Sequence, residues 1–336
     1  MKKLVIIGVG MAIGPHMASL AALEHRAELS HVVTRSAARR DAFQKHYGFG
    51  ATDDLDGAIL DPSVDAVILL TPPDSHRSLG ERILSAGKHL LIEKPAGLIT
   101  DDTRFLADIA AAKGLLAAPV LQHRFRPTVR AAGAIIASQS LGRLCGANCL
   151  IPWWRPQSYY NEQGRGSLAR DGGGVLLTQA IHTLDVLRAL CGEVKIKAAQ
   201  VGTSPLHSME AEDMVCALAE FGPDAAPGTI MATTACYPGL PETVALIFEH
   251  ATIRLDGQSL QVFYHNGRSE ASLDAGSSGG EADPMAFDHA DHLALLTAFL
   301  DALEGKIPLM VDLSDLIKTR EVIDQLISYR REAEHN

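Results

Sequence analysis

Short apolar runs alternate with helix-like segments over the first 120 residues, and this alternation limits the possible folds more than any other feature of the chain. The apolar runs span residues 4–7, 29–33, 64–70, 89–92 and 115–120. Ser36, Ser75 and Thr100 stand just before the intervening segments, where side-chain N-caps of helices are expected. Such alternation predicts a parallel sheet covered by helices.

The pattern changes after residue 127. Helices are expected at residues 128–138, 175–190, 288–303 and 313–334. β-favouring runs follow one another at residues 145–154, 195–201, 214–221, 229–237, 244–249, 252–255 and 260–264. Consecutive strands of this kind predict a largely antiparallel sheet. We therefore predict an α/β domain at residues 1–122 and, at residues 123–336, an α+β domain with a large, mostly antiparallel open sheet.

Composition restricts the functions open to the chain. Its 336 residues include 30 Lys and Arg against 40 Asp and Glu, a formal net charge of −10, which argues against nucleic-acid binding. The five cysteines form no C-x-x-C pair, so we expect reduced thiols in a cytoplasmic protein. The sequence contains no run of 18 apolar residues, so no membrane span is predicted. His289 and His292 have the spacing of residues on one face of a helix. No ligand cluster accompanies them in the sequence, so no metal site is predicted.

Three glycines follow the first apolar run and precede a helical segment. Gly8, Gly10 and Gly14 have the spacing G-x-G-x-x-x-G, with Ile13 where a third glycine is usual. The first two glycines allow a tight turn and a close approach of the backbone to a pyrophosphate, which the helix N-terminus stabilises. The alternatives are a purely structural turn and, because Lys2 and Lys3 precede the apolar run, the start of a secretory signal.

The end of the second expected strand lacks the carboxylate that commonly binds the ribose of NAD. The segment reads Thr34-Arg35-Ser36, with Arg39 nearby. Hydroxyl groups and arginines suit a 2′-phosphate, so NADP is the preferred cofactor and NAD the alternative. The structural alternative is a serine N-cap followed by an exposed basic helix face.

The segment Ile92-Glu93-Lys94-Pro95, directly after a predicted strand, resembles the E-K-P tripeptide of the Gfo/Idh/MocA oxidoreductases. Further elements match this family in order and cover nearly the whole chain: the glycine turn through His16, the stretch from Thr71 to His76, Gln122 to Pro127, and Gly172 to Gly174 followed by His182 and Asp185. The resemblance implies a Rossmann-type N-terminal domain, followed in the sequence by a substrate-binding and oligomerisation domain.

The resemblance also implies which residues act in the reaction. The nicotinamide is expected between Lys94 and His182, the two candidate catalytic residues, and either of them could transfer the proton. Members of the family often have Asp four residues before the histidine, where this chain has Thr178. The Thr178 hydroxyl could orient the imidazole as a weaker substitute, and Asp185 is the alternative. The candidate cofactor-binding residues are Gly8, Gly10, Met11, Ala12, Ile13, Thr34, Arg35, Ser36, Arg39, Thr71, Pro72, Pro73, His76, Glu93, Lys94 and Gln122.

An aromatic cluster at residues 153–160 suits the C–H face of a sugar ring. Trp153, Arg155 and Tyr160 are therefore candidate substrate-binding residues, together with Lys94, Thr178 and His182. The alternative for the aromatic residues is the core of a strand or a dimer surface.

These features predict an NAD(P)-dependent oxidoreductase that transfers a hydride between nicotinamide and a hydroxyl or carbonyl group of a sugar, polyol or related cyclic compound. Two alternatives remain: a hydrolase or lyase that uses tightly bound nicotinamide transiently, and a cofactor-binding sensor without turnover. The expected partners are a small sugar-like substrate and further copies of the chain, in a homodimer or homotetramer.

Overall fold

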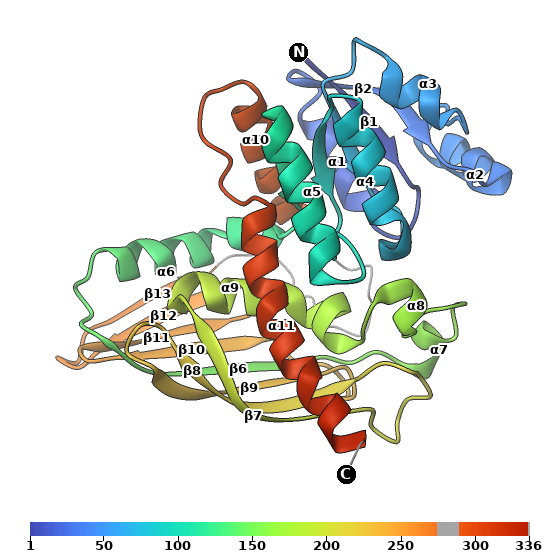
Figure 1. The fold of residues 1–336 in the computed structure, drawn as a ribbon. Helices are drawn as coiled ribbons and strands as arrows, with labels where there is room; N and C mark the ends of the chain where they lie inside the picture. The colour runs from blue at the N-terminus through green and yellow to red at the C-terminus, as the bar shows by residue number, and fades with distance from the viewer. Residues whose placement is uncertain (274–288, 335–336) are drawn as a thin grey trace. The chain divides into compact units, whose positions relative to one another are not determined.

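The computed structural model describes residues 1–273 and 289–334, which form two compact units (Figure 1). The first unit contains residues 1–121 and 289–317, and the second contains the described residues of 122–288 and 318–336. The sequence predicted one continuous second domain from residue 123. The observed division differs because helix α10 (Ala290–Leu303) packs on helix α1 (Ile13–Ala22) in the first unit.

The first unit contains a five-stranded parallel sheet. Its strands lie in the order β2-β1-β3-β4-β5, with bounds β1 Lys2–Ile7, β2 Ala27–Val33, β3 Ala66–Leu69, β4 His89–Ile92 and β5 Ala117–Pro119. The residues of β3 and most of those in β1 and β4 are buried, as expected of strands covered on both faces. This arrangement confirms the predicted Rossmann-type domain.

Helices of the first unit pack in pairs beside this sheet. Helix α1 contacts α10, and α4 contacts α5. The remaining bounds are α2 Ala37–Tyr47, α3 Leu55–Leu60, a 3-10 turn at Pro73–Ser75, α4 His76–Ser85 and α5 Thr100–Lys113. Helix α10 buries Leu295, Leu296 and Phe299, and Arg26 forms ion pairs with Asp301 and Glu304 at 2.7 and 2.9 Å. Apolar burial and charge pairing thus hold a late segment of the chain in the first unit.

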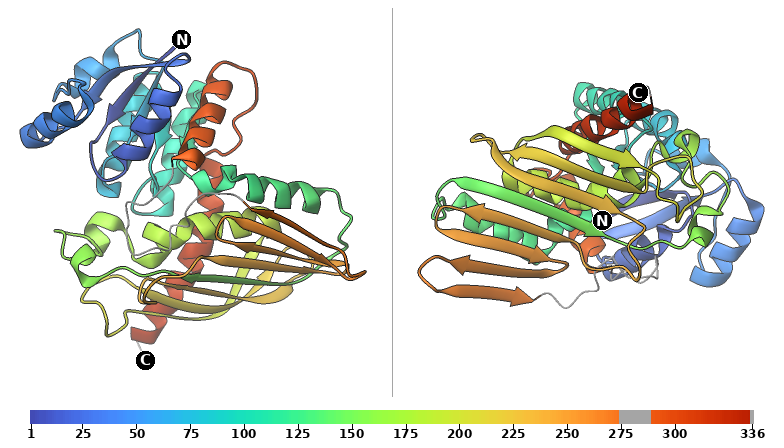
Figure 2. Two further views of the ribbon diagram at one scale, coloured as in Figure 1. Left: turned by 180° about the vertical axis from the view of Figure 1, so that it is seen from behind. Right: turned by 90° about the horizontal axis from the view of Figure 1, so that it is seen from below.

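The second unit contains an eight-stranded sheet in the order β13-β12-β11-β10-β6-β9-β8-β7 (Figure 2). All neighbouring strands are antiparallel except β6 and β9, which are parallel. The strand bounds are β6 Leu144–Pro152, β7 Val194–Gly202, β8 Met214–Phe221, β9 Ala226–Thr233, β10 Thr243–Phe248, β11 Ala251–Asp256, β12 Ser259–Tyr264 and β13 Ser269–Leu273. The predicted large, mostly antiparallel sheet is confirmed.

Helices α6 and α9 contact this sheet through β6, β10, β11 and β12. The helical bounds of the second unit are a 3-10 turn at Gln122–Phe125, α6 Pro127–Ala137, α7 Gln157–Tyr160, α8 Leu168–Asp171, a π-helical turn at Leu176–Ala180 and α9 Ile181–Cys191. Helix α11 (Leu313–Glu334) begins in the first unit and continues into the second.

Candidate functional site

Three sequence motifs lie side by side at one edge of the parallel sheet. The Leu70 amide donates to the Ile7 carbonyl at 2.8 Å, and the Glu93 amide donates to the Leu69 carbonyl at 2.9 Å. The carboxyl ends of β1, β3 and β4 are therefore neighbours, and the glycine turn, the Thr71 loop and the Glu93-Lys94 segment leave the sheet together. Ligands of open parallel sheets bind at this edge.

The glycine turn has the geometry that a dinucleotide pyrophosphate requires. Gly8 has φ +102°, and a Cβ there would lie 2.8 Å from the Leu70 carbonyl carbon. A Cβ on Gly10 would meet nothing closer than 4.0 Å, so this side of the turn leaves room for a ligand. Helix α1 begins at Ile13, directly after Met11 and Ala12, and directs its N-terminus at the same turn. The residues present thus fit the phosphates of a nicotinamide dinucleotide.

The loop after β2 contains features of both sequence interpretations. Ser36 caps α2, since its hydroxyl accepts the Arg39 amide at 3.3 Å, as the structural alternative predicted. The Arg40 side chain donates to the Thr34 carbonyl at 2.9 Å and pairs with Asp53 at 3.1 Å. Asp53 comes from a segment that pairs with the end of β2, because Thr52 bridges Val33. This carboxylate was not predictable from the residues contiguous with β2, because Asp53 comes from a segment about 20 residues later in the chain.

His76 joins two of the loops at the sheet edge. Its ring is fully buried, with Nδ1 2.7 Å from the Pro95 carbonyl oxygen and Nε2 2.6 Å from the Thr71 carbonyl oxygen. Burial lowers the pKa of His76, against the two carbonyl groups, which favour the protonated ring. The imidazole fixes the loop after β3, with Pro72 and Pro73, to the loop after β4.

Glu93 anchors the backbone of Lys94. Its Oε1 lies 3.2 Å from His16 Nε2, and its Oε2 accepts the Lys94 amide at 3.2 Å. Burial alone would raise the pKa of Glu93, but the His16 hydrogen bond and the positive charge of Lys94 lower it below its ordinary value. An ionised carboxylate therefore sits directly before the half-buried Lys94.

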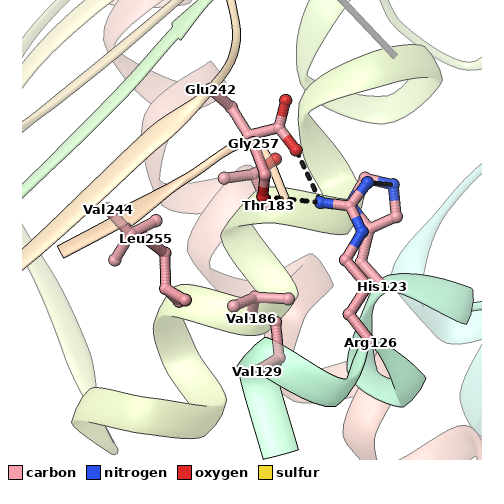
Figure 3. Close-up of a pocket in the computed structure, with 9 residues that line it drawn as sticks. All are labelled: His123, Arg126, Val129, Thr183, Val186, Glu242, Val244, Leu255 and Gly257. Carbon is pink, nitrogen blue, oxygen red and sulfur yellow. Dashed lines mark hydrogen bonds and ion pairs between the residues drawn. The ribbon is translucent and has the colours of Figure 1, made fainter. Parts of the chain in front are cut away.

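His182 lies in the first turn of α9 in the second unit and is mostly buried. Its ring packs against the His123 ring, with centroids 4.8 Å apart and planes inclined by 35°. His123 Nε2 accepts from the Arg126 guanidinium at 2.8 Å, and the same guanidinium donates to Glu242 at 2.7 Å. Figure 3 shows the Arg126 guanidinium between Glu242 and His123. The candidate catalytic histidine thus rests on a buried charged cluster.

The two residues expected to orient His182 have hydrogen-bond partners of their own. Thr178 lies in the π-helical turn, and its hydroxyl donates to the Gly174 carbonyl at 2.7 Å. The buried Asp185 accepts from Arg124 Nε at 2.6 Å and from the Thr319 hydroxyl at 2.9 Å. Burial raises the pKa of Asp185, and the guanidinium of Arg124 acts against this shift. The orienting roles of Thr178 and Asp185 remain predictions.

The expected substrate-binding aromatic residues are buried inside the second unit. Trp153 donates through Nε1 to Glu242 at 3.3 Å, and the Tyr160 hydroxyl lies 2.6 Å from that of Thr234. Arg155 is 3% exposed, and burial lowers the pKa of its guanidinium. Burial favours a position in the core for Trp153, directly after β6, and for Tyr160, which lies in α7 and not in a strand. Gln122, predicted in the first domain, begins the second unit and is also buried.

Comparison with protein families agrees with this geometry. A model described as an oxidoreductase family with an NAD-binding Rossmann fold matches residues 2–119, and a GFO/IDH/MocA C-terminal domain model matches residues 129–254. The chain belongs to the Gfo/Idh/MocA oxidoreductase family. As a Gfo/Idh/MocA protein it carries the NAD-binding fold of that family, which is the part of the cofactor prediction that the comparisons support.

Curated relatives of this Gfo/Idh/MocA protein include sugar oxidoreductases. It is 29% identical over 164 residues to the uncharacterized oxidoreductase YhhX of Escherichia coli, covering 49% of this chain and 46% of the relative. It is 28% identical over 180 residues to levoglucosan dehydrogenase of Pseudarthrobacter phenanthrenivorans, covering 53% and 44%. These matches span about half the length of each relative.

Solved structures share the fold of the whole chain. Levoglucosan dehydrogenase in complex with NADH and levoglucosan has a TM-score of 0.86 at 18% identity, covering 98% of this chain and 97% of that one. The WlbA dehydrogenase of Bordetella pertussis in complex with NADH and UDP-GlcNAcA has a TM-score of 0.82 at 22% identity, with 99% and 97% covered. Within residues 1–273 and 289–334, no helix combines the length and the apolar character needed to cross a bilayer.

Proposed function

We propose that this protein is an NAD(P)-dependent oxidoreductase acting on a hydroxyl or carbonyl group of a sugar, polyol or related cyclic compound. The observation that carries the proposal is the shared sheet edge, where the Gly8 turn and the Glu93-Lys94 segment follow neighbouring strands. The names of relatives support the substrate class, since levoglucosan dehydrogenase, D-xylose dehydrogenase and 1,5-anhydro-D-fructose reductase all act on sugar-like compounds.

Each candidate catalytic residue has a distinct role in this proposal. When bound, the nicotinamide accepts or donates the hydride. The Lys94 ammonium donates a hydrogen bond to the reacting oxygen and stabilises the negative charge that develops there. The imidazole of His182 takes the hydroxyl proton in oxidation and returns it in reduction, since an imidazole can act both as a general base and as a general acid. Glu93, held by His16, keeps the backbone of Lys94 in place.

Replacing Lys94 tests the mechanism. We expect Lys94→Ala to lower kcat by about 10²–10⁴-fold, because both a polarising and a proton-handling role have effects of this size. The dissociation constant of the cofactor should stay nearly unchanged. Lys113→Ala, on an exposed position of α5, is the matched control and should behave as wild type. A near-normal kcat in Lys94→Ala would remove this residue from the mechanism.

The substrate is best sought with an absorbance screen of sugars, sugar acids and inositols, run with reduced and oxidised cofactor in both directions. Oxidation or reduction of the cofactor in step with product is the expected result. Product formed without net change in the cofactor would favour a hydrolase or lyase instead. Cofactor binding without any turnover would favour a sensor.

We further propose a preference for NADP over NAD. Arg35 follows β2 and Arg39 lies in the first turn of α2; both are exposed, and among the described residues neither side chain forms an ion pair. Both guanidinium groups are thus available to a 2′-phosphate. The Asp53 carboxylate would repel a 2′-phosphate, but its charge is neutralised by the Arg40 guanidinium at 3.1 Å.

Fluorescence titration of NADPH and NADH measures this preference. A charge-assisted hydrogen bond contributes ~1.5–3 kcal/mol, so one good contact from Arg35 should favour NADPH by roughly ten- to a hundredfold. Arg35→Ala should abolish most of that difference, whereas Arg104→Ala, an exposed arginine on α5, should leave it intact. Tighter binding of NADH than of NADPH to the wild-type protein would refute the proposal.

The proposal includes a cytoplasmic homodimer or homotetramer. The strands of the second unit expose apolar side chains, and a self-association surface would cover them. These side chains are Leu150, Leu218, Ile247 and Phe263.

A further inference from the structure

Three metal-ligating side chains meet in the first unit although they are far apart in the sequence. His16 lies on α1, Glu93 directly follows β4, and His292 lies on α10. One ligand atom from each residue can be chosen so that all three lie within 4.8 Å of one another. We call these three residues the His₂Glu cluster.

One buried ring nitrogen of the His₂Glu cluster has no hydrogen-bond partner among the described residues. His16 Nε2 and Glu93 Oε1 are 3.2 Å apart, and the rings of His16 and His292 have centroids 5.3 Å apart and nearly perpendicular planes. His292 is 9% exposed, and its Nδ1 is buried without a hydrogen-bond partner among residues 1–273 and 289–334. A buried nitrogen acceptor or donor without a partner is rare in folded proteins and calls for an explanation.

We propose that the His₂Glu cluster binds one divalent transition-metal ion of the zinc class. Two imidazoles and a carboxylate are ligands that Zn²⁺ and Co²⁺ favour over Mg²⁺ or Ca²⁺, which prefer oxygen alone. The fourth coordination position is left for water.

The spacing of the ligand atoms suits such an ion after a small adjustment. Bonds of about 2.0–2.1 Å in tetrahedral geometry separate neighbouring ligand atoms by roughly 3.4 Å. His16 and Glu93 already have this spacing at 3.2 Å. All three ligand atoms lie within 4.8 Å of one another, so the widest separation has to shorten by roughly 1.4 Å at most.

The charges around the His₂Glu cluster both favour and oppose the ion. Glu93 supplies a negative charge, since His16 and Lys94 hold its pKa below the ordinary value. The groups facing His292 are His16, Glu93, His289 and Lys94. The Lys94 ammonium opposes a cation and limits the affinity.

A bound ion would connect three separate segments of the first unit: α1, the end of β4 and α10. An ion that binds only the folded protein raises its stability by mass action. The ion is therefore expected to raise the melting temperature of the protein, and a chelator should reverse the increase.

Titration of the tag-free, metal-free protein with Co²⁺ tests the proposal. We expect one saturable equivalent with the visible absorption of a tetrahedral or five-coordinate Co²⁺ ion, displaced by Zn²⁺. His292→Leu, which removes the ligand nitrogen and places an apolar side chain in this buried position, should raise the dissociation constant by about tenfold or more. His25→Ala removes an exposed histidine just after α1 and should leave binding unchanged.

X-ray absorption of the Zn²⁺-loaded wild-type protein provides a second measurement that does not depend on a variant folding. Two imidazoles and at least one oxygen around the zinc are expected. The absence of saturable binding, equal losses in His292→Leu and His25→Ala, or a zinc shell with fewer than two imidazoles would each overturn the proposal.

Discussion

Arg126 and Glu242 form an ion pair with both side chains about 5% exposed. Removing two charges from water costs several kcal/mol each, and the pair offsets this cost only while both members are present. Here Glu242 also accepts from Trp153, and Arg126 also donates to His123. The cluster under His182 is therefore sensitive to the loss of a single charge.

Glu242→Gln should reveal this sensitivity. The substitution leaves the Arg126 guanidinium buried without a full counter-charge, so we expect the free energy of unfolding to fall by about 3–5 kcal/mol. Urea denaturation at pH 7 measures the change. Glu249→Gln, which removes the charge from the exposed pair with Arg143, should have a much smaller effect. Equal changes in the two variants would contradict the importance of burial.

Single residues were predictable where their roles depend on local backbone. The glycine spacing predicts a tight turn at Gly8. The structure shows why the residue is glycine: φ is positive, and a Cβ would lie 2.8 Å from the Leu70 carbonyl carbon. The burial of Trp153 and Tyr160 was not predictable, because Trp153 follows the last residue of β6 and Tyr160 lies in the four-residue helix α7, where no period shows which side faces the core. The His₂Glu cluster was not predicted, since its members come from three distant segments.

At the scale of elements, strands and long helices follow the apolar pattern, and short elements do not. Strands β4 and β8 have the predicted bounds. The predicted strand at 229–237 ends at Thr233, and the predicted helix at 175–190 opens with a π-helical turn. The short helices α3, α7 and α8 were not predicted, because four to six residues contain too little periodicity to separate a helix from a turn.

The carboxylate of Asp65, directly before β3, hydrogen-bonds to two residues of β1. Asp65 accepts from the Lys3 amide at 2.8 Å and from the Lys2 ammonium at 3.0 Å. Burial would raise the pKa of Asp65, but these two donors lower it below its ordinary value. A lowered carboxyl pKa contributes stability that is present above the unfolded pKa and is lost as the pH falls through the folded pKa.

Asp65→Asn should therefore destabilise the protein in a pH-dependent way. At pH 7 we expect the free energy of unfolding to fall by about 1 kcal/mol, since the side chain is partly exposed. The difference from wild type should shrink as the pH falls below about 4. Urea denaturation across this pH range measures it, with Asp108→Asn on the exposed side of α5 as control. A difference that does not change with pH would contradict the assigned ionisation.

At the scale of the molecule, the two-unit organisation was predictable, but the chain path was not. The apolar residues of α10 show that this helix has a buried face, and they do not show which unit covers it. The structure places that face against α1, with Arg26 pairing to Asp301 and Glu304. The first unit is therefore built from two segments that are far apart in the sequence.

Residues 1–121 alone should consequently be an incomplete unit. We expect this fragment to melt at a lower temperature, and to bind more of a hydrophobic dye, than residues 1–121 joined by a flexible linker to residues 289–317. The missing α10 leaves the apolar surface of α1 exposed to water. Circular dichroism melting of both proteins makes the comparison. Identical melting curves would show that α10 contributes nothing to the stability of the first unit.

The late position of α10 has a consequence for synthesis on the ribosome. Residue 317 emerges about 200 residues after residue 121, a delay of roughly 10–40 s at ~5–20 residues per second. During this interval the nascent glycine turn and its sheet exist without the helix that covers α1. The whole eight-stranded sheet leaves the exit tunnel before the amino-terminal unit can close. We expect the growing chain to expose an apolar surface to chaperones in its N-terminal unit, although this part of the chain is synthesised first.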